Sequence, residues 1–286
     1  GSGWQLASYL LEPPVSVWFF DVGQGDAILF MDRQGRSVLI DGGRTGQGFS
    51  VLIPALDALG INQVDLVIAT HAHDDHIGGL IELADYGRIR QLVMTRGLYD
   101  AIQNLGSDAL DAESGGLAEL IRLASDAGYG VRTVAAHDTM ALGETIFLTV
   151  LAPPDDPLIN PEAIVDGNAW SLLLLAEVSG QSLLLTADCT ADAEMRLVEQ
   201  QAWPQADVLK VAHHGSAYTT QAAMLAQVRP KVAVISVGAN WYGHPADTVL
   251  ERLQDSGCPV FRTDESGAVH IRFSSDRLDI SEFSAH

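Results

Sequence analysis

The sequence predicts an α/β protein in which two β-sheets pack face to face and helices cover their outer sides. Apolar, β-prone segments are concentrated in both halves of the chain, and each half also carries segments with helical periodicity. The 286 residues are 47% hydrophobic, which is enough to bury a large core. The sequence contains no short repeat, which would indicate a solenoid, and no low-complexity segment, which would indicate a disordered chain.

In the first half, short apolar segments alternate with turn signals and with helices. The first strand leads into Asp21-Val22-Gly23-Gln24-Gly25-Asp26, whose glycines and aspartates favour a turn. The predicted strands are 15–20, 27–31, 37–40 and 64–70, and the predicted helices are 51–59 and 77–86. Residues 96–130 are expected to be mainly helical, with an interruption at Gly115-Gly116.

In the second half, strands and helices alternate after a long loop. The expected loop is 153–168, which is rich in Pro, Asp and Asn. The predicted strands are 131–134, 146–151, 171–178, 182–186, 208–211, 232–237, 260–262, 268–273 and 277–280, and the predicted helices are 191–201, 219–228 and 246–256. We expect 171–178 and 182–186 to form a hairpin around Ser179-Gly180.

The chain is expected to form one domain over residues 15–286, because no linker of distinct composition divides it. The opening Gly1-Ser2-Gly3 is typical of a cleaved purification tag, so we interpret residues 1–14 as tag scar and linker. The longest apolar run, 172–176, has the length of a strand and is too short to cross a bilayer. We therefore expect an excised, soluble fragment.

The composition is strongly acidic, with 37 acidic against 16 basic residues and a formal net charge of -21. Such a charge repels a phosphate backbone at long range and counts against tight, sequence-blind binding of nucleic acid by this chain alone. It is equally consistent with a simple effect on solubility. No Gly-rich nucleotide loop and no Ser or Cys nucleophile motif occurs, so no nucleotide cofactor is expected.

The densest group of chemically active side chains is His71-Ala72-His73-Asp74-Asp75-His76, directly after a predicted buried strand. Imidazoles and carboxylates are the ligands that zinc and manganese take in proteins. A tight loop can place His71 and His73 on one metal ion and direct Asp75 and His76 to a second. A merely solvated loop is the alternative, but it does not explain this density. Asp74 is interpreted as an exposed carboxylate that caps the following helix.

The pattern His-x-His-x-Asp-His resembles the signature of the metallo-β-lactamase superfamily. Six further motifs flank it: Asp21-Val22-Gly23-Gln24-Gly25-Asp26, Leu39-Ile40-Asp41-Gly42-Gly43, Asn168-Ala169-Trp170-Ser171, Thr186-Ala187-Asp188, His213-His214-Gly215-Ser216 and Gly243-His244-Pro245. Together they resemble the C-terminal domain of the ComEC competence family over roughly residues 15–275. The resemblance implies a four-layer αββα sandwich and a hydrolase with two divalent metal ions.

The resemblance also implies a ligand set. Asp188 corresponds to the carboxylate that bridges both ions, although Ala187 replaces the glycine that usually precedes it. His213 corresponds to the last ligand of the second ion, with His214 as the alternative. Asn168 occupies the position where a third histidine for the first ion is expected. Because an amide oxygen is a harder ligand than imidazole, we expect Mn²⁺ to be favoured over Zn²⁺.

The remaining candidates lie around these ligands. His244 is expected to contact phosphate or to protonate the leaving oxygen, with packing beside aromatics or completion of the first metal site as alternatives. Ser216 and His214 are further candidates for binding substrate, although Ser216 is equally a turn residue. Asp26 and Asp41 are expected to accept hydrogen bonds from ligand histidines, or else only to satisfy their own turns.

The ComEC resemblance implies a nuclease that degrades the non-imported DNA strand during natural transformation, with Asp75 and His244 as catalytic residues. It also implies several partners: single-stranded DNA, the membrane channel part of the same polypeptide, and other DNA-uptake proteins. The parent protein is then expected in the bacterial inner membrane, with this domain on the extracytoplasmic side. Trp241 and Tyr242 are expected either to stack a base or to form a hydrophobic wall. A stand-alone phosphodiesterase, esterase or lactonase and a non-catalytic DNA-binding module remain alternatives.

Overall fold

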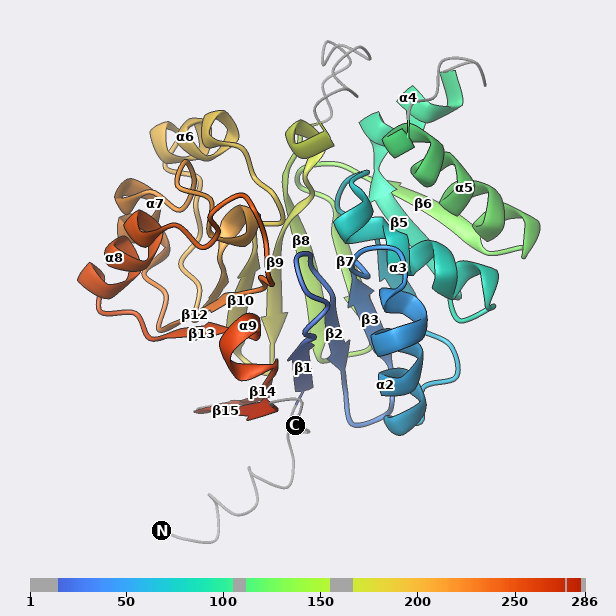
Figure 1. Cartoon of the computed structure of the whole chain (residues 1–286), viewed down its shortest axis with the longest axis horizontal. Coiled ribbons are helices and arrows are strands. Elements are labelled where there is room, and N and C mark those ends of the chain that lie inside the picture. Colours follow the sequence, from blue (N-terminus) through green and yellow to red (C-terminus); the bar gives the residue numbers. More distant parts are fainter. Residues whose placement is uncertain (1–14, 105–111, 155–166, 276, 284–286) are drawn as a thin grey trace, which may run out of the picture.

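Two β-sheets form the centre of the molecule in the computed structural model, which describes residues 15–104, 112–154, 167–275 and 277–283 (Figure 1). The first sheet contains β1 (Val15–Phe19), β2 (Ile28–Met31), β3 (Ser37–Ile40), β4 (Leu66–Ile68), β5 (Gln91–Thr95), β6 (Gly130–Val134), β14 (Ala268–Ser274) and β15 (Arg277–Phe283). Its order is β15-β14-β1-β2-β3-β4-β5-β6. The strands from β3 to β6 run parallel, and the other neighbouring pairs are antiparallel.

The second sheet is built from the later strands of the chain. It contains β7 (Thr139–Leu142), β8 (Ile146–Ala152), β9 (Leu173–Val178), β10 (Gln181–Leu185), β11 (Val208–Lys210), β12 (Val232–Ile235) and β13 (Val260–Arg262). Its order is β13-β12-β11-β10-β9-β8-β7. The strands from β10 to β13 are parallel, whereas β7 to β10 are antiparallel and include the predicted hairpin at Ser179-Gly180.

Helices cover the outer side of each sheet (Figure 1). Those beside the first sheet are η1 (Gly48–Leu52), α2 (Ile53–Ala58), α3 (Asp74–Asp85), α4 (Arg96–Asn104) and α5 (Ala112–Asp126). Those beside the second sheet are α6 (Ala191–Glu199), α7 (Ala222–Val228) and α8 (Asp247–Asp255). The short elements η4 (Gly167–Trp170), η5 (Ala212–Gly215) and α9 (Thr263–Ser266) lie in the connections. No helix among the residues described here is long and apolar enough to span a membrane.

Three apolar clusters separate the four layers. Strand β3 contributes to two of these clusters. Val38 and Ile40 lie in the cluster between the sheets, whereas Leu39 lies in the cluster beneath the helices. A strand covered on both faces is continuously apolar, which is why the segment 37–40 could be predicted as a strand but not assigned a face. Fully buried members are Phe30 and Leu174 between the sheets, Leu80 and Leu117 beneath the first helices, and Leu184 and Leu253 beneath the second. The predicted αββα sandwich is confirmed.

Several local predictions were wrong. Strands β5 and β7 and helix α9 were not expected, and Gly115 and Gly116 lie inside α5 instead of interrupting it. Gly116 faces Ile77 of α3, so tertiary packing outweighs the poor helix propensity of glycine at this contact. Most of the expected loop 153–168 and all of the expected tag and linker 1–14 lie outside the described residues.

Candidate metal centre

The candidate site lies where several loops meet at one edge of the two sheets. Strands β1, β3 and β4 of the first sheet end at this edge, as do the parallel strands β10, β11 and β12 of the second. Loops at the carboxyl ends of parallel strands therefore bring together residues that are far apart in the sequence. Across the sheets, His76 Nε2 lies 3.4 Å from Asp188 Oδ1, which joins the two halves of the predicted ligand set.

Helix α3 begins earlier than predicted, so the histidine cluster is divided between a loop and a helix. His73 is the residue before the helix, and Asp75 and His76 lie in its first turn instead of a loop. Asp74 does not cap its own helix; it accepts hydrogen bonds from the Thr45 hydroxyl and backbone N–H. The loop after β1 packs against this turn, and a side chain at Gly25 would collide with the backbone carbonyl of Asp75.

Three buried histidines are held in the same tautomer by their neighbours. The Thr70 hydroxyl donates to Asp41, so the Nδ1–H of His71, 3.0 Å from that hydroxyl, donates to it. The Nδ1–H of His76 donates to Asp41 at 2.7 Å, and the Nδ1–H of His214 donates to the carbonyl of Ser236 at 2.8 Å. In their neutral form, all three imidazoles therefore direct an unprotonated Nε2 into the site, as ligands for a metal require.

Asp188 lies among these nitrogen atoms. Its Oδ1 is 3.4 Å from His76 Nε2 and 3.5 Å from His214 Nε2. These three atoms are buried and have no hydrogen-bond partner among the residues that the structure describes. Buried polar atoms are rarely left without partners, so a group of three facing one another fits a cation.

The donor atoms form two overlapping groups that share Asp188. His71, His76 and Asp188 each offer an atom within 4.8 Å of the others, and Asp26, Asp188 and His214 do the same. A third group joins Asp75, His76 and His214, whose Nε2 lies 3.5 Å from Asp75 Oδ2. His73 Nδ1 lies 3.2 Å from His71 Nε2, beside the first group. The residues present therefore fit divalent metal ions.

The two neighbouring histidines of η5 point in different directions. His213 and His214 both have left-handed backbones, with φ of 47° and 52°. The His214 side chain is buried against Asp75 and Asp188, whereas that of His213 is 30% exposed and lies 3.6 Å from Asp188 Oδ2. Hence His214, and not His213, lies in the group of donor atoms that contains Asp75.

The electrostatics of the site favour a positive charge between the carboxylates and the imidazoles. Burial would lower the pKa of His76, but Asp188 and Asp41 outweigh it and raise this pKa. Burial would raise the pKa of Asp188, but His214 and His76 outweigh it and hold this pKa well below its usual range. Burial similarly opposes ionisation of Asp75, whose pKa is nevertheless lowered by His214 and His76. A proton or a metal ion can supply the positive charge.

Asp41 and Asp26 support the site in different ways. Asp41 holds His76 and Thr70, as expected for a carboxylate that orients a ligand histidine. Asp26 instead forms an ion pair with Lys210, and its Oδ1 lies 3.7 Å from His214 Nδ1. The backbone of Asp26 donates to the Asp75 carbonyl and accepts from Gly43 N–H, so it joins the loops after β1 and β3 to α3.

Lys210 is the main residue that the sequence analysis missed. It is fully buried, and its Nζ also donates to the carbonyl of Ala187 at 3.3 Å. Ala187 has a left-handed backbone, with φ of 42°, directly before Asp188. A lysine within the apolar segment 208–211, in a chain with two lysines, was the available signal, because lysine is almost never fully buried without a partner.

Asn168 lies on the side of the first donor group. Its neighbour Gly167 packs directly against the His73 imidazole, leaving no room for a side chain there. Asn168 Oδ1 is buried, and none of the described residues forms a hydrogen bond with it. A buried amide oxygen without a partner is compatible with the predicted role of Asn168 as a ligand of the first ion.

His244 lies beyond His213 at the outer side of the site. The two rings are 5.5 Å apart, and His244 Nδ1 has no hydrogen-bond partner in the described part of the chain. Burial, together with His213 and His214, lowers the pKa of His244 to about 4. Its imidazole is therefore neutral at pH 7, which suits the first of its two expected roles, contact with phosphate, better than the second, protonation of the leaving oxygen.

Ser216 is less suited to bind substrate than expected. Its side chain is buried, and its backbone N–H already donates to the carbonyl of His213. Its own carbonyl accepts the backbone N–H of Thr219. These contacts favour the alternative interpretation of Ser216 as a turn residue.

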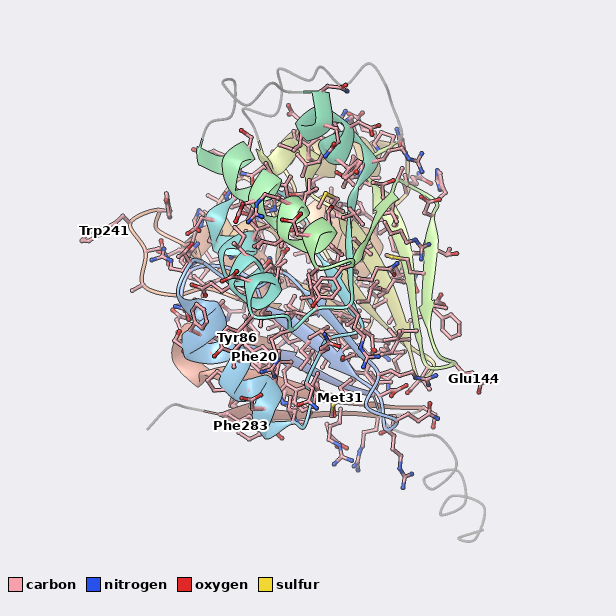
Figure 2. The ribbon with its side chains drawn as sticks, turned by 90° about the vertical axis from the view of Figure 1, so that its right-hand side faces the viewer. Phe20, Met31, Tyr86, Glu144, Trp241 and Phe283 are labelled. Atoms are coloured by element: carbon pink, nitrogen blue, oxygen red, sulfur yellow. The ribbon has the colours of Figure 1, made fainter. Side chains whose placement is uncertain are left out.

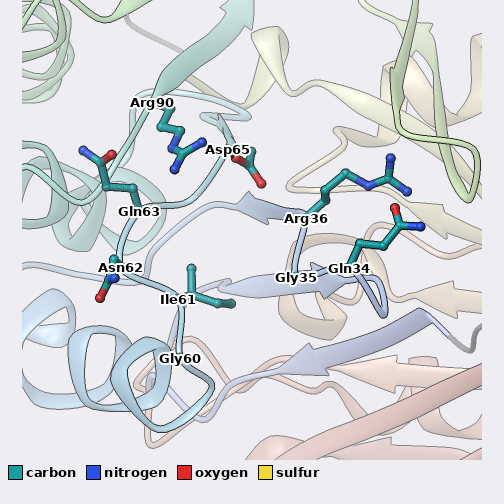
Figure 3. Close-up of a pocket in the computed structure, with 9 residues that line it drawn as sticks. All are labelled: Gln34, Gly35, Arg36, Gly60, Ile61, Asn62, Gln63, Asp65 and Arg90. Carbon is teal, nitrogen blue, oxygen red and sulfur yellow. Dashed lines mark ion pairs between the residues drawn. The ribbon is translucent and has the colours of Figure 1, made fainter.

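A separate polar pocket of about 350 Å³ lies at the opposite edge of the first sheet, before β3, β4 and β5 (Figure 3). It is lined by Gln34, Gly35, Arg36, Gly60, Ile61, Asn62, Gln63, Asp65 and Arg90. Both arginines that line it are paired with carboxylates, since Arg90 contacts Asp65 at 3.2 Å and Arg36 contacts Asp32 at 2.6 Å. This pairing distinguishes the pocket from the metal centre.

The chain belongs to the metallo-beta-lactamase superfamily, whose family model matches residues 20–239. Fold and donor cluster together define a metal-dependent hydrolase. The chain is also 32% identical over 272 residues to the ComE operon protein 3 of Bacillus subtilis (strain 168), covering 89% of this chain and 32% of that protein. It is 30% identical over 283 residues to the Recombination protein 2 of Haemophilus influenzae, covering 97% of this chain and 31% of that protein.

A third relative is the Competence protein ComA of Neisseria gonorrhoeae, with 28% identity, 91% of this chain and 32% of that protein covered. The predicted resemblance to the ComEC family is therefore confirmed, and the chain spans about a third of the length of these relatives. Solved structures share the fold. They include CmlA, a diiron beta-hydroxylase from Streptomyces venezuelae, with a TM-score of 0.56, 14% identity and coverage of 92% of this chain and 54% of that one. Zn(2+)-bound PqqB from Methylobacterium extorquens has a TM-score of 0.52, 15% identity and coverage of 84% and 85%.

Proposed function

We propose that this chain is a two-metal phosphodiesterase that hydrolyses DNA, with single-stranded DNA as its preferred substrate. The observation that carries the proposal is the group of buried atoms without partners, His76 Nε2, Asp188 Oδ1 and His214 Nε2, in a chain related to competence proteins. Two divalent ions, when bound, supply Lewis acidity and an activated water for attack on phosphorus.

The ligands are assigned from the tautomers and the overlapping donor groups. The first ion takes His71 and His73, with Asn168 on its outer side. The second ion takes Asp75, His76 and His214. Asp188 is shared by both. Because Asn168 contributes an amide oxygen where imidazole is usual, we propose that Mn²⁺ is preferred to Zn²⁺.

Residues of the chain position the phosphodiester around this centre. The neutral imidazole of His244 donates one hydrogen bond to a non-bridging phosphate oxygen and does not transfer a proton to the leaving group. His213, between His244 and Asp188, separates the binding surface from the buried ligands. Asp75 contributes to catalysis as a metal ligand, since its carboxylate is already engaged with His214.

The biological role is proposed from the relatives and not from the site alone. We propose that the domain degrades the DNA strand that is not imported during natural transformation. It would act within a longer polypeptide whose membrane part holds the DNA, on the extracytoplasmic side of the bacterial inner membrane, together with other DNA-uptake proteins. Tethering raises the local DNA concentration, so the net charge of -21 does not prevent turnover.

The test is release of nucleotides from an end-labelled single strand by metal-free chain reconstituted with Mn²⁺ or Zn²⁺. Bis(p-nitrophenyl) phosphate, a lactone and a carboxyl ester are assayed in parallel, with Asp188→Asn as the matched variant. Mn²⁺-dependent cleavage of DNA that Asp188→Asn abolishes is the expected result. Cleavage of the lactone or carboxyl ester without cleavage of either phosphodiester would overturn the proposal. DNA binding without hydrolysis of any substrate would identify a binding module.

A further inference from the structure

We propose that Tyr218, Trp241 and Tyr242 form a stacking surface that binds unpaired nucleobases of the DNA strand entering the metal centre. This inference rests on the proposed function and specifies how the substrate is held. The three rings are called the aromatic rim below. They belong to two loops, one after η5 and one after β12.

The aromatic rim is exposed to an unusual degree. Trp241 is fully exposed, and Tyr218 and Tyr242 are 77% and 76% exposed. Figure 2 shows Trp241 at the tip of a loop that stands away from the body of the molecule. Large aromatics exposed on loops beside a site indicate a contact surface, because burying them in a folded chain would otherwise be favourable.

The loop that carries Trp241 and Tyr242 is held in shape from within. Asn240 Oδ1 accepts the backbone N–H groups of Tyr242 and His244, at 3.0 and 3.1 Å. Asn240 Nδ2 donates to the carbonyls of Gly238 and His244, at 2.8 and 2.7 Å. One side chain thus closes the loop with four hydrogen bonds, so the exposed rings are presented on a supported backbone.

The loop that carries Tyr218 is fastened beside it. The guanidinium of Arg252 donates to the carbonyls of Ala217 and Thr219, on either side of Tyr218, at 3.1 and 3.0 Å. Arg252 belongs to α8, which begins directly after the Trp241 loop. The carbonyl of Gly215 also accepts the N–H of Ala246, which joins the two loops at their bases.

The aromatic rim is continuous with the metal centre. Tyr242 and His244 are in ring contact at 5.8 Å, and His244 and His213 at 5.5 Å. His213 Nε2 lies 3.6 Å from Asp188 Oδ2. A strand whose phosphate reaches His244 therefore has its adjacent bases beside these rings.

The charge of the chain favours bases over other occupants. A net charge of -21 repels an anionic lipid surface and also the phosphates of DNA, so a DNA strand held here needs an attraction that is not electrostatic. Base–aromatic stacking does not depend on positive charge and tolerates any sequence. Stacking is also possible only where bases are unpaired, so the aromatic rim would select single-stranded over duplex DNA.

The test compares a 12-nucleotide oligo(dT) with an abasic strand of the same length and phosphate number. Binding is measured by fluorescence anisotropy with metal-free chain in EDTA, where no turnover occurs. Trp241→Ala is expected to weaken oligo(dT) binding by about 5- to 150-fold, the range for a lost base–aromatic stack, and to leave abasic binding little changed. Trp241→Phe, which keeps a ring, is expected to restore most of the affinity.

Phe147→Ala is the matched control. Phe147 is 44% exposed on β8, near Glu144, which Figure 2 shows on the opposite side of the molecule from Trp241. This control is expected to bind both strands like the wild type. Equal binding of oligo(dT) by wild type and Trp241→Ala, or an equal loss for both strands, would overturn the inference. Trp241-dependent binding to lipid vesicles without any effect on oligo(dT) would overturn it as well.

The two proposals fail separately. If Mn²⁺-loaded wild type cleaves neither DNA nor bis(p-nitrophenyl) phosphate, the proposed function fails, and the binding assay still decides whether the aromatic rim holds bases. If DNA is cleaved but Trp241→Ala binds oligo(dT) normally, only the inference about the aromatic rim fails.

Discussion

The two edges of the first sheet carry polar clusters of opposite character. At one edge, Asp188, His76 and His214 face one another with buried atoms that lack partners. At the other edge, Arg90 and Arg36 line a pocket in which each guanidinium already contacts a carboxylate. The first arrangement is costly unless a cation binds, whereas the second is complete as it stands.

A functional cluster and a structural one in the same fold differ in whether their buried polar atoms have partners. The number of charged residues does not separate the two edges, and neither does the presence of a pocket. Buried polar atoms without partners separate the two edges, because folding alone selects against such atoms.

Carboxylate-to-amide substitution should have a large effect on activity at one edge and a small effect at the other. Asp188→Asn is expected to reduce phosphodiester hydrolysis to background and to lower the metal content, because an amide cannot bridge two cations. Asp65→Asn, in the pocket, is expected to change activity by no more than about twofold, because this residue lies at the end of the sheet opposite the metal centre. Metal analysis and initial rates of both variants test this prediction. Equal losses of activity in Asp188→Asn and Asp65→Asn would show that the two edges do not differ in function.

The two lysines provide a second comparison between a buried and an exposed ion pair. Lys210→Met leaves the Asp26 carboxylate buried and unpaired, so we expect the free energy of unfolding to fall by about 3–5 kcal/mol. Lys231→Met removes an exposed pair with Asp207 and should cost less than about 1 kcal/mol.

Unfolding in denaturant measures the free energy of unfolding of Lys210→Met and of Lys231→Met. The double variant Lys210→Met with Asp26→Leu should recover much of the loss, because no unpaired charge then remains in the core. If the double variant were less stable than Lys210→Met alone, unpaired charge would not be the cause.

Substitutions of the two adjacent histidines of η5 should differ in their effect on metal affinity. His214→Ala removes a buried Nε2 directed at Asp75 and Asp188, and we expect affinity for the second ion to fall by at least about 10–100-fold, the range for losing even an outer partner. His213→Ala should retain both ions. Titration with Mn²⁺ followed by metal analysis tests this, and the reverse order would restore the interpretation that the sequence first favoured.

The smallest effect is expected at His244. His244→Asn should slow cleavage by about 10–100-fold, the value of one hydrogen bond to a charged group. The pKa of His244 is lowered to about 4, so its imidazole is neutral above that pH and loses no proton as the pH rises through neutrality. The shape of the rate profile between about pH 6 and 9 should therefore be the same in the variant. Loss of a descending limb in His244→Asn would show that this histidine acts as an acid.

Much of the fold could be predicted because its signals are local. The segments 37–40 and 260–262 were predicted with their observed bounds, since short apolar runs between turn residues define strands. β5 and β7 were missed, and β7 in particular alternates weakly at the edge of its sheet. The early start of α3 was missed because His73 is not a usual residue before a helix.

The sequence by itself determined the superfamily and the clustered donors His71, His73, Asp75 and His76, because ligands within one short segment are visible as a pattern. The different directions of the His213 and His214 side chains became visible only in the folded chain, since a left-handed turn separates two neighbours that have the same side chain. The tertiary structure also revealed Lys210 beneath Asp26, because a buried ion pair between residues 184 positions apart has no local signature. Donor chemistry is a property of the residues, whereas direction and burial arise only when the two sheets meet.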